Sequence, residues 1–176
     1  MGSPEGKMMR DLSEKTYLSL SESIRKKAYL GTFLNLLDKL ITWITFLSYP
    51  LLLAYLSFHQ KALMLPEITV PAVSFLAVSL FRKQLNAKRP YELYHFTPVI
   101  HKETFGCSFP SRHVFSIFMI AMAFFYYDHT LGFDFMILGG ILALIRVLGG
   151  VHFIRDVLAG ACAGIICGIV GFYVVF

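Results

Sequence analysis

Five apolar runs alternate with polar segments along the chain. They cover residues 40–58, 68–81, 113–127, 135–145 and 157–176. The first and last runs hold no charged residue and are 19 and 20 residues long, which is the length that an α-helix needs to cross the hydrocarbon core of a bilayer. The second run reaches a passable length when Leu65 and Pro66 are counted with it. The pattern predicts an all-α membrane bundle with about five transmembrane helices.

The segment that precedes the first run is amphipathic. Residues 12–30 place Leu12, Leu20 and Ile24 near helical spacing, with basic residues on the other side. This pattern is typical of a helix that lies in the membrane interface, and a solvated basic tail with some helix is an equal alternative. Residues 1–11 are expected to be a flexible tail or a remnant of expression. We therefore expect a single membrane domain over residues 12–176.

The composition agrees with a membrane location. Hydrophobic residues make up 56% of the chain, charged residues only 15%, and the mean hydropathy is +0.63, whereas a soluble domain is about 45–50% apolar. The net charge of +5 is small, and the basic residues are not arrayed on a soluble face. No nucleic-acid partner is predicted. The three cysteines have neither a disulfide pattern nor a zinc-ligand spacing.

Basic residues are concentrated on one side of the predicted bundle. With five spans, the N-terminal segment, the loop over residues 82–112 and the turn over residues 146–156 share one face. That face holds 15 of the 16 Lys and Arg residues, and only Lys61 lies opposite. The positive-inside rule places this face in the cytoplasm. A phosphate-binding site would also be basic, on either side of the membrane, so the charge pattern leaves the sidedness open.

Three polar clusters stand at the ends of predicted spans. They cover residues 82–90, 110–113 and 146–156. Because each lies at the end of a helix on the same face, a compact bundle brings them together although they are far apart in the sequence. A polar loop as long as that over residues 82–112 is more often functional than idle.

The third cluster contains an imidazole and a carboxylate in register. His152 and Asp156 are four residues apart, so they share one face of a helix. A carboxylate bound to one ring nitrogen selects the tautomer and makes the other nitrogen a better nucleophile. His113 is placed to act as the general acid on a departing alkoxide. Gly150 precedes the pair and leaves room for a substrate headgroup.

The remaining polar residues of the clusters suit a phosphoryl group. Arg82, Arg89 and Arg146 carry forked donors that match phosphate oxygens. Ser111 offers a hydroxyl at a helix start, where free amides favour an anion. Together the clusters predict phosphoryl transfer to an imidazole followed by attack of water. No metal or other cofactor is expected, because the arginines stabilise the transferred charge.

The clusters resemble the signature of the type 2 phosphatidic acid phosphatase superfamily, K-x6-RP, PSGH and SR-x5-H-x3-D. The corresponding stretches here are Arg82-x6-Arg89-Pro90, residues 110–113 and Ile145-Arg146-x5-His152-x3-Asp156. The resemblance implies a membrane enzyme that hydrolyses a lipid phosphate monoester or diphosphate through a phosphohistidine on His152. Candidate substrates are phosphatidate, phosphatidylglycerophosphate and polyprenyl diphosphate. It also implies a helical bundle whose site lies at the membrane surface.

Three positions depart from that signature. Arg82 replaces the family's Lys, and Lys83 is an alternative occupant of that site if the helix is rotated by one residue. Arg112 replaces Gly and is expected to add a phosphate donor or to narrow the entrance. Ile145 replaces Ser and removes one hydroxyl. These departures concern substrate preference more than activity.

Two other functions and one other partner are compatible with parts of the sequence. A transporter would place ionisable residues within its spans, whereas here they gather at one end. A non-catalytic lipid-binding protein on the same fold is the second alternative. Gly160, Gly164 and Gly168 form a doubled GxxxG pattern, which favours close packing inside the bundle and leaves a homodimer as an alternative. Lys102 is expected to be an interface anchor.

Overall fold

The structure is a computed structural model in which residues 15, 17–19, 22–24, 26–102 and 104–176 are described. Those residues form helices and connecting loops without a β-strand. The helices are α2 (Ala28–His59), α3 (Met64–Leu85), α4 (Pro90–Leu93), α5 (Arg112–Tyr127), α6 (His129–Leu148) and α7 (Ile154–Ile169). A short 3-10 helix, Lys61–Leu63, joins α2 to α3, and a π-helical segment, Val170–Val175, continues α7. The predicted all-α class is confirmed.

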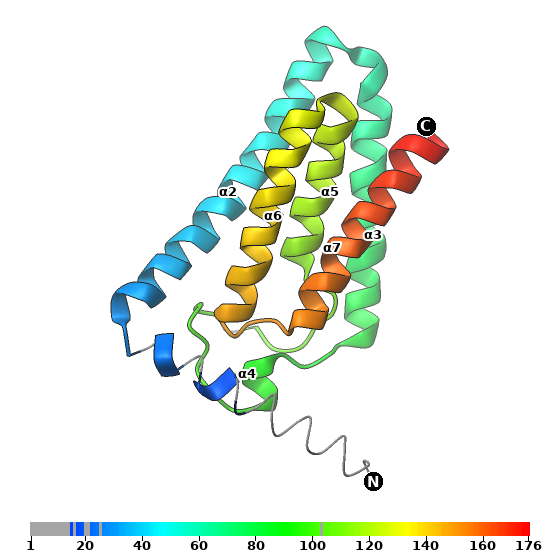
Figure 1. Cartoon of the computed structure of the whole chain (residues 1–176). Helices are drawn as coiled ribbons and strands as arrows, with labels where there is room; N and C mark the ends of the chain where they lie inside the picture. Colours follow the sequence, from blue (N-terminus) through cyan, green and yellow to red (C-terminus); the bar gives the residue numbers. More distant parts are fainter. Residues whose placement is uncertain (1–14, 16, 20–21, 25, 103) are drawn as a thin grey trace.

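Figure 1 shows α2, α3, α5, α6 and α7 running along one bundle axis, with α4 and the loops around it at one end. Among the described residues, four segments are long and apolar enough to cross a membrane, namely Tyr29–His59, Lys61–Leu93, His129–Leu148 and Ile154–Val175. The chain is therefore a multi-pass membrane protein. The fifth apolar helix, α5, has only 16 residues, and it packs chiefly on α6 and α7 in the middle of the bundle.

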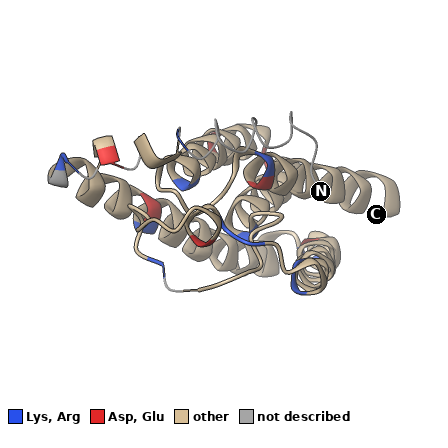
Figure 2. Cartoon of the chain, turned by 90° about the horizontal axis from the view of Figure 1, so that it is seen from below, with Lys and Arg blue, Asp and Glu red and all other residues tan. Residues whose placement is uncertain are grey.

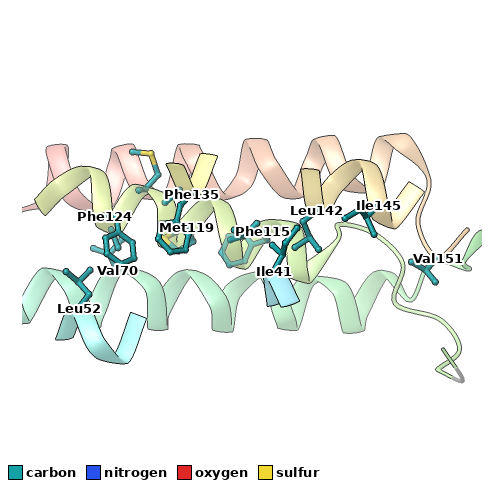
Figure 3. Packing of buried hydrophobic residues seen from close by; sticks show 14 of the residues in the cluster. Ile41, Leu52, Val70, Phe115, Met119, Phe124, Phe135, Leu142, Ile145 and Val151 are labelled. Carbon is teal, nitrogen blue, oxygen red and sulfur yellow. The ribbon is translucent and has the colours of Figure 1, made fainter. Parts of the chain in front are cut away.

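The core is built around α5. Its buried residues include Phe115, Met119 and Phe124, which meet Phe135 and Leu142 of α6. Figure 3 shows these side chains stacked along the bundle, with Ile41, Leu52 and Val70 of α2 and α3 on the other side. Many large apolar side chains on α2 and α3 remain exposed, as expected for surfaces that face lipid rather than water.

Two helix ends differ from the prediction. Residues 128–134 were expected to form a turn, but α6 already begins at His129, because the carboxylate of Asp128 accepts a hydrogen bond from the Leu131 amide at 3.0 Å and caps the helix. Helix α2 begins at Ala28, so the end of the predicted interfacial segment belongs to α2. In the rest of that segment, residues 17–19 and 22–24 are helical. The predicted tail, residues 1–11, lies outside the described residues.

The glycine pattern of α7 is used inside the chain. Gly160, Gly164 and Gly168 are all buried against α5. A Cβ atom at Gly160 would lie 2.6 Å from the carbonyl oxygen of Ser111, so only glycine allows the two backbones to come this close. The alternative prediction, a homodimer through these glycines, would need the face that α5 covers.

The three polar clusters come to the same end of the bundle. The C-terminal ends of α3 and α6 and the N-terminal ends of α5 and α7 all lie at the end that carries α4 (Figure 1). Figure 2, viewed from this end, shows Lys and Arg positions on the helix ends and loops that surround it. This arrangement places residues 82–90, 110–113 and 146–156 around one site.

Candidate active site

The turn between α6 and α7 presents His152. Gly149 caps the end of α6, and Gly150 follows with φ of 74°, a left-handed conformation that glycine adopts at little cost. A Cβ atom on Gly150 would lie 2.8 Å from the ring of Phe96. Gly150 therefore makes the turn and admits the neighbouring loop, and the sequence expectation that it leaves room for a headgroup stays a prediction.

His152 lies against a buried carboxylate. Its Nδ1 atom is 3.5 Å from Oδ2 of Asp156, and both side chains are almost fully buried. The same Oδ2 accepts hydrogen bonds from the Ser108 hydroxyl and, at 3.1 Å, from the Phe153 amide. Ser108 Oγ is also 3.4 Å from Nδ1 of His152. The carboxylate is thus held on the Nδ1 side of the ring, which favours the tautomer with a proton on Nδ1.

Ser108 is a part of this arrangement that the sequence reasoning missed. The residue is completely buried, and its own amide donates to the carbonyl of Ala87 at 2.8 Å. The only signal in the sequence is its place two residues before Pro110, within the polar loop over residues 82–112.

The other ring nitrogen of His152 faces a guanidinium group. Nη1 of Arg89 lies 3.4 Å from Nε2, where it is placed to donate. The same Arg89 donates to the carbonyl oxygens of Gly106, at 3.1 Å, and Val151, at 3.2 Å. These bonds hold the guanidinium beside the nitrogen that the Asp156 contact leaves available for chemistry.

Burial lowers the pKa of His152 to about 4, against the hydrogen-bonding and charge effects of Asp156, which raise it. The nearby charges of Arg89 and Arg146 act in the same direction as burial. His152 is therefore neutral at physiological pH, which is the protonation state that a nucleophile needs.

Arg82 points into the loop that carries the second cluster. Its two amino groups donate to the carbonyl oxygens of Cys107 and Pro110. Its guanidinium therefore helps to shape the loop that leads into α5. The alternative residue, Lys83, is exposed, so the rotation that would exchange the two is not seen.

Arg146 has a protein partner that the sequence reasoning did not connect to it. Its Nε and Nη2 atoms lie 2.7 Å and 3.0 Å from the two carboxylate oxygens of Asp38. Both residues are buried, and they join α6 to α2 across 108 positions of the chain. The fork of Arg146 is thus held in place by a two-point ion pair.

His113 stands where two hollows meet. The first is a polar cavity of about 440 Å³, lined by Asp38, Ile100, His101, Lys102, His113 and Arg146. The second is an apolar groove of about 640 Å³ between α2, α3 and α5, with Arg112 and His113 at its end. Arg146 lies close enough to His113 for its charge to act on it, and His152 is close enough to do so when it is protonated. The two predicted catalytic histidines therefore belong to one site.

Two other predicted residues lie at its edge. Ser111 is the N-cap residue of α5, and its amide donates to the carbonyl of Asp156 at 2.8 Å. Its buried hydroxyl has no hydrogen-bond partner among the described residues. Arg112 is exposed beside the groove, with its guanidinium 5.7 Å from the ring centre of Phe75. The structure thus turns Arg112 toward the groove rather than toward His152.

Lys102 lines the polar cavity, and its expected role as an interface anchor stays a prediction. Burial and the charges of Arg146 and Arg89 lower its pKa to about 7. In the described part of the chain, no group of three His, Cys, Asp or Glu side chains is placed to hold a metal ion.

Comparison with known proteins places this site in a family. A model of the PAP2 superfamily matches residues 63–176, which include all three polar clusters. The chain belongs to the PAP2 superfamily. Among solved structures, LpxE of Aquifex aeolicus is similar at 26% identity with a TM-score of 0.62, over 82% of this chain and 93% of that one.

A second solved structure, of a PAP2-type protein, shares the fold. It is a transmembrane PAP2-type phosphatidylglycerolphosphate phosphatase from Bacillus subtilis, with 21% identity, a TM-score of 0.59, and coverage of 90% of this chain and 92% of that one. A comparison with curated proteins gave no match. Of the departures from the PAP2 signature, Ile145 is buried in the core cluster, so its side chain serves packing where the family has a hydroxyl.

Proposed function

We propose that this PAP2 protein is a membrane phosphatase that hydrolyses a lipid phosphate monoester or diphosphate. The observation that carries the proposal is the meeting of a polar, cation-lined cavity and an apolar groove at His113. A lipid phosphate has the same two-part chemistry, with an anionic head and a hydrocarbon tail. The match to the PAP2 superfamily and the similarity in fold to a transmembrane PAP2-type phosphatidylglycerolphosphate phosphatase support the same class of reaction.

The first step is attack by Nε2 of His152 on phosphorus. The lone pair of Nε2 forms the P–N bond while the bond from phosphorus to the lipid oxygen breaks. His113 gives a proton to that oxygen, so the alcohol leaves neutral. The positive charge that forms on the imidazole is stabilised by Asp156, which is 3.5 Å from Nδ1. Arg89, at 3.4 Å from Nε2, binds a phosphoryl oxygen.

In the second step, water attacks the phosphohistidine. The P–N bond breaks, His113 takes a proton from the water, and inorganic phosphate leaves through the polar cavity. For a diphosphate, the leaving group is the lipid monophosphate instead of an alcohol. Phosphatidate, phosphatidylglycerophosphate and polyprenyl diphosphate all fit this scheme, because each couples an anionic group to an apolar tail.

The groove positions the tail beside the chemistry. It runs from Arg112 and His113 past Phe75 of α3 and Phe46 of α2, and ends near Leu53 and Ile68. The side chains of Phe46, Leu53, Ile68 and Phe75 are apolar, so a hydrocarbon tail bound along them would keep the phosphate headgroup at His113. Arg112 at its mouth is placed to meet a second anionic group of the lipid.

The test is phosphate release from vesicles or micelles of these lipids, with EDTA present. We expect activity without added metal, complete loss in His152→Ala, and normal activity in His59→Ala, which removes an exposed histidine at the opposite end of the bundle. Activity that the chelator abolishes, or a fully active His152→Ala protein, would refute the mechanism. Lipid binding without phosphate release would favour the non-catalytic alternative.

We further infer that the catalytic end faces the cytoplasm, because 15 of the 16 Lys and Arg residues belong to that side of the predicted topology. Lys61→Cys and Lys88→Cys place a thiol at either end of the bundle. An impermeant thiol reagent added to intact cells should label the first and spare the second, relative to the unsubstituted chain. The reverse pattern would place the site outside.

A further inference from the structure

The polar cavity is lined by a cation, Lys102, that none of the three sequence clusters contains. Lys102 and Arg146 line it, and the charges of Arg82, Arg89, Arg146 and Asp38 all act on Lys102. Lys102 is supplied by the loop between α4 and α5, and it is only partly exposed. Asp38 is the carboxylate that acts on Lys102. The several positive charges around the cavity nevertheless make it a site for a multiply charged anion.

Most of the other cations are committed to the protein itself. Arg146 uses two nitrogens on Asp38. Arg82 uses both amino groups on the carbonyl oxygens of Cys107 and Pro110. Arg89 alone lies against the proposed nucleophile, at 3.4 Å from Nε2 of His152. Their remaining donors are fixed in direction by these bonds.

Lys102 differs from these arginines in having no such commitment. Its ammonium group has no hydrogen-bond or ion-pair partner among the described residues, although it lies near Asp38. Burial and the surrounding guanidinium groups disfavour its charge and lower its pKa to about 7. A phosphate in the cavity would supply the missing counter-charge and accept from its three N–H donors.

We propose that Lys102 is a substrate-binding residue that contacts the phosphoryl group in the polar cavity. This inference rests on the proposed phosphatase function. Arg82, at the start of the first cluster, is bound to two backbone carbonyl oxygens. Under this proposal Lys102, a loop residue, supplies instead the flexible point charge that binds phosphate. This also gives a role to an ammonium that lines a polar cavity.

The experiment compares Lys102→Met, Lys102→Arg and the matched control Lys39→Met. Lys39 is an exposed lysine next to Asp38 on α2 and does not line the cavity. We expect Lys102→Met to lower kcat/KM by about 10- to 100-fold, with most of the change in KM. The inhibition constant for inorganic phosphate should rise by a similar factor. Lys102→Arg should recover much of the loss, and Lys39→Met should behave as wild type.

The phosphate measurement also separates this inference from the general function. Phosphate binding by wild type and variants is measured directly by calorimetry in detergent, where no turnover is needed. If the wild type releases no phosphate from any lipid, the proposed function fails, and weaker phosphate binding by Lys102→Met alone would still support the site. Unchanged phosphate affinity in Lys102→Met, or a loss confined to kcat with no rescue by Lys102→Arg, would overturn the inference.

Discussion

The ion pair between Asp38 and Arg146 should be a main link between the first transmembrane helix and the catalytic core. Asp38→Asn keeps the shape of the side chain but removes its charge and one acceptor. The two contacts are 2.7 Å and 3.0 Å long, and the side chains are 11% and 4% exposed. Arg146 would then be left as a buried cation without its partner.

The cost follows from this burial. Removing one partner of a buried ion pair costs about 3–5 kcal/mol. Asn retains one acceptor for the guanidinium, so the lower end of that range, about 3 kcal/mol, is expected. For a chain of this size, each kcal/mol shifts the midpoint of thermal unfolding by about 2–4 °C. Asp38→Asn should therefore lower the midpoint by about 6–12 °C.

The assay is thermal unfolding of the purified protein in detergent, with Asp134→Asn as the control. Asp134 is an exposed Asp on α6, and its substitution should change the midpoint by about 2 °C or less. A cycle with Arg146→Gln isolates the pair, because the double variant should cost much less than the sum of the single ones. An Asp38→Asn protein as stable as the control, or strictly additive effects in the cycle, would refute this account of the link.

Three further substitutions test other parts of the site and the bundle. Ser108→Ala removes the hydroxyl that donates to Asp156 and should lower kcat about 10-fold. The control Ser57→Ala, at the far end of α2, should leave the steady-state kinetics unchanged. Equal kcat values for the two variants would show that the Ser108 hydrogen bond does not contribute to catalysis. Folded His152 has a pKa of about 4, below the ordinary value of about 6.5, so the unfolded chain binds the proton first and stability is lost as the pH falls from about 6.5 to 4. His152→Gln should remove about 3 kcal/mol of that dependence, measured by unfolding across this range, and an unaltered pH dependence would contradict it. Gly160→Ala would bring a methyl group within 2.6 Å of a backbone oxygen and should cost about 1–3 kcal/mol of stability, whereas Gly140→Ala, with open space around its Cβ, should be neutral or stabilising in the same unfolding assay.

The sequence was sufficient to predict the bundle and the helix ends that meet. Uninterrupted apolar runs identify membrane helices because lipid tolerates no exposed backbone polar group. The ends of these runs were less certain. The start of α6 was missed because His129 and Asp134 are polar, and polar residues in a membrane sequence suggest a turn, whereas here Asp128 caps a helix that extends beyond them.

The partners of the charged residues could not be predicted. Arg146 was expected to bind phosphate, and nothing near it in the sequence indicates Asp38, which lies 108 positions away on another helix. The contacts of Arg82 are with backbone carbonyls, which carry no side-chain signal. Lys102 was expected to be an interface anchor. The charged residues around it come from several elements, and only the folded chain brings them together.

The close packing of α5 on α7 joins the two proposed catalytic histidines through the main chain. The Ser111 amide is bonded to the Asp156 carbonyl at 2.8 Å, and Gly160 and Gly164 bring the two helices into contact just beyond it. The spacing of the proposed acid and nucleophile is therefore set where two backbones touch, while α2 and α3 form the outer walls of the groove. Under the proposed function, substitutions on those outer walls change which lipid tail is accepted while the reacting atoms keep their places, so that selectivity and chemistry can be altered separately.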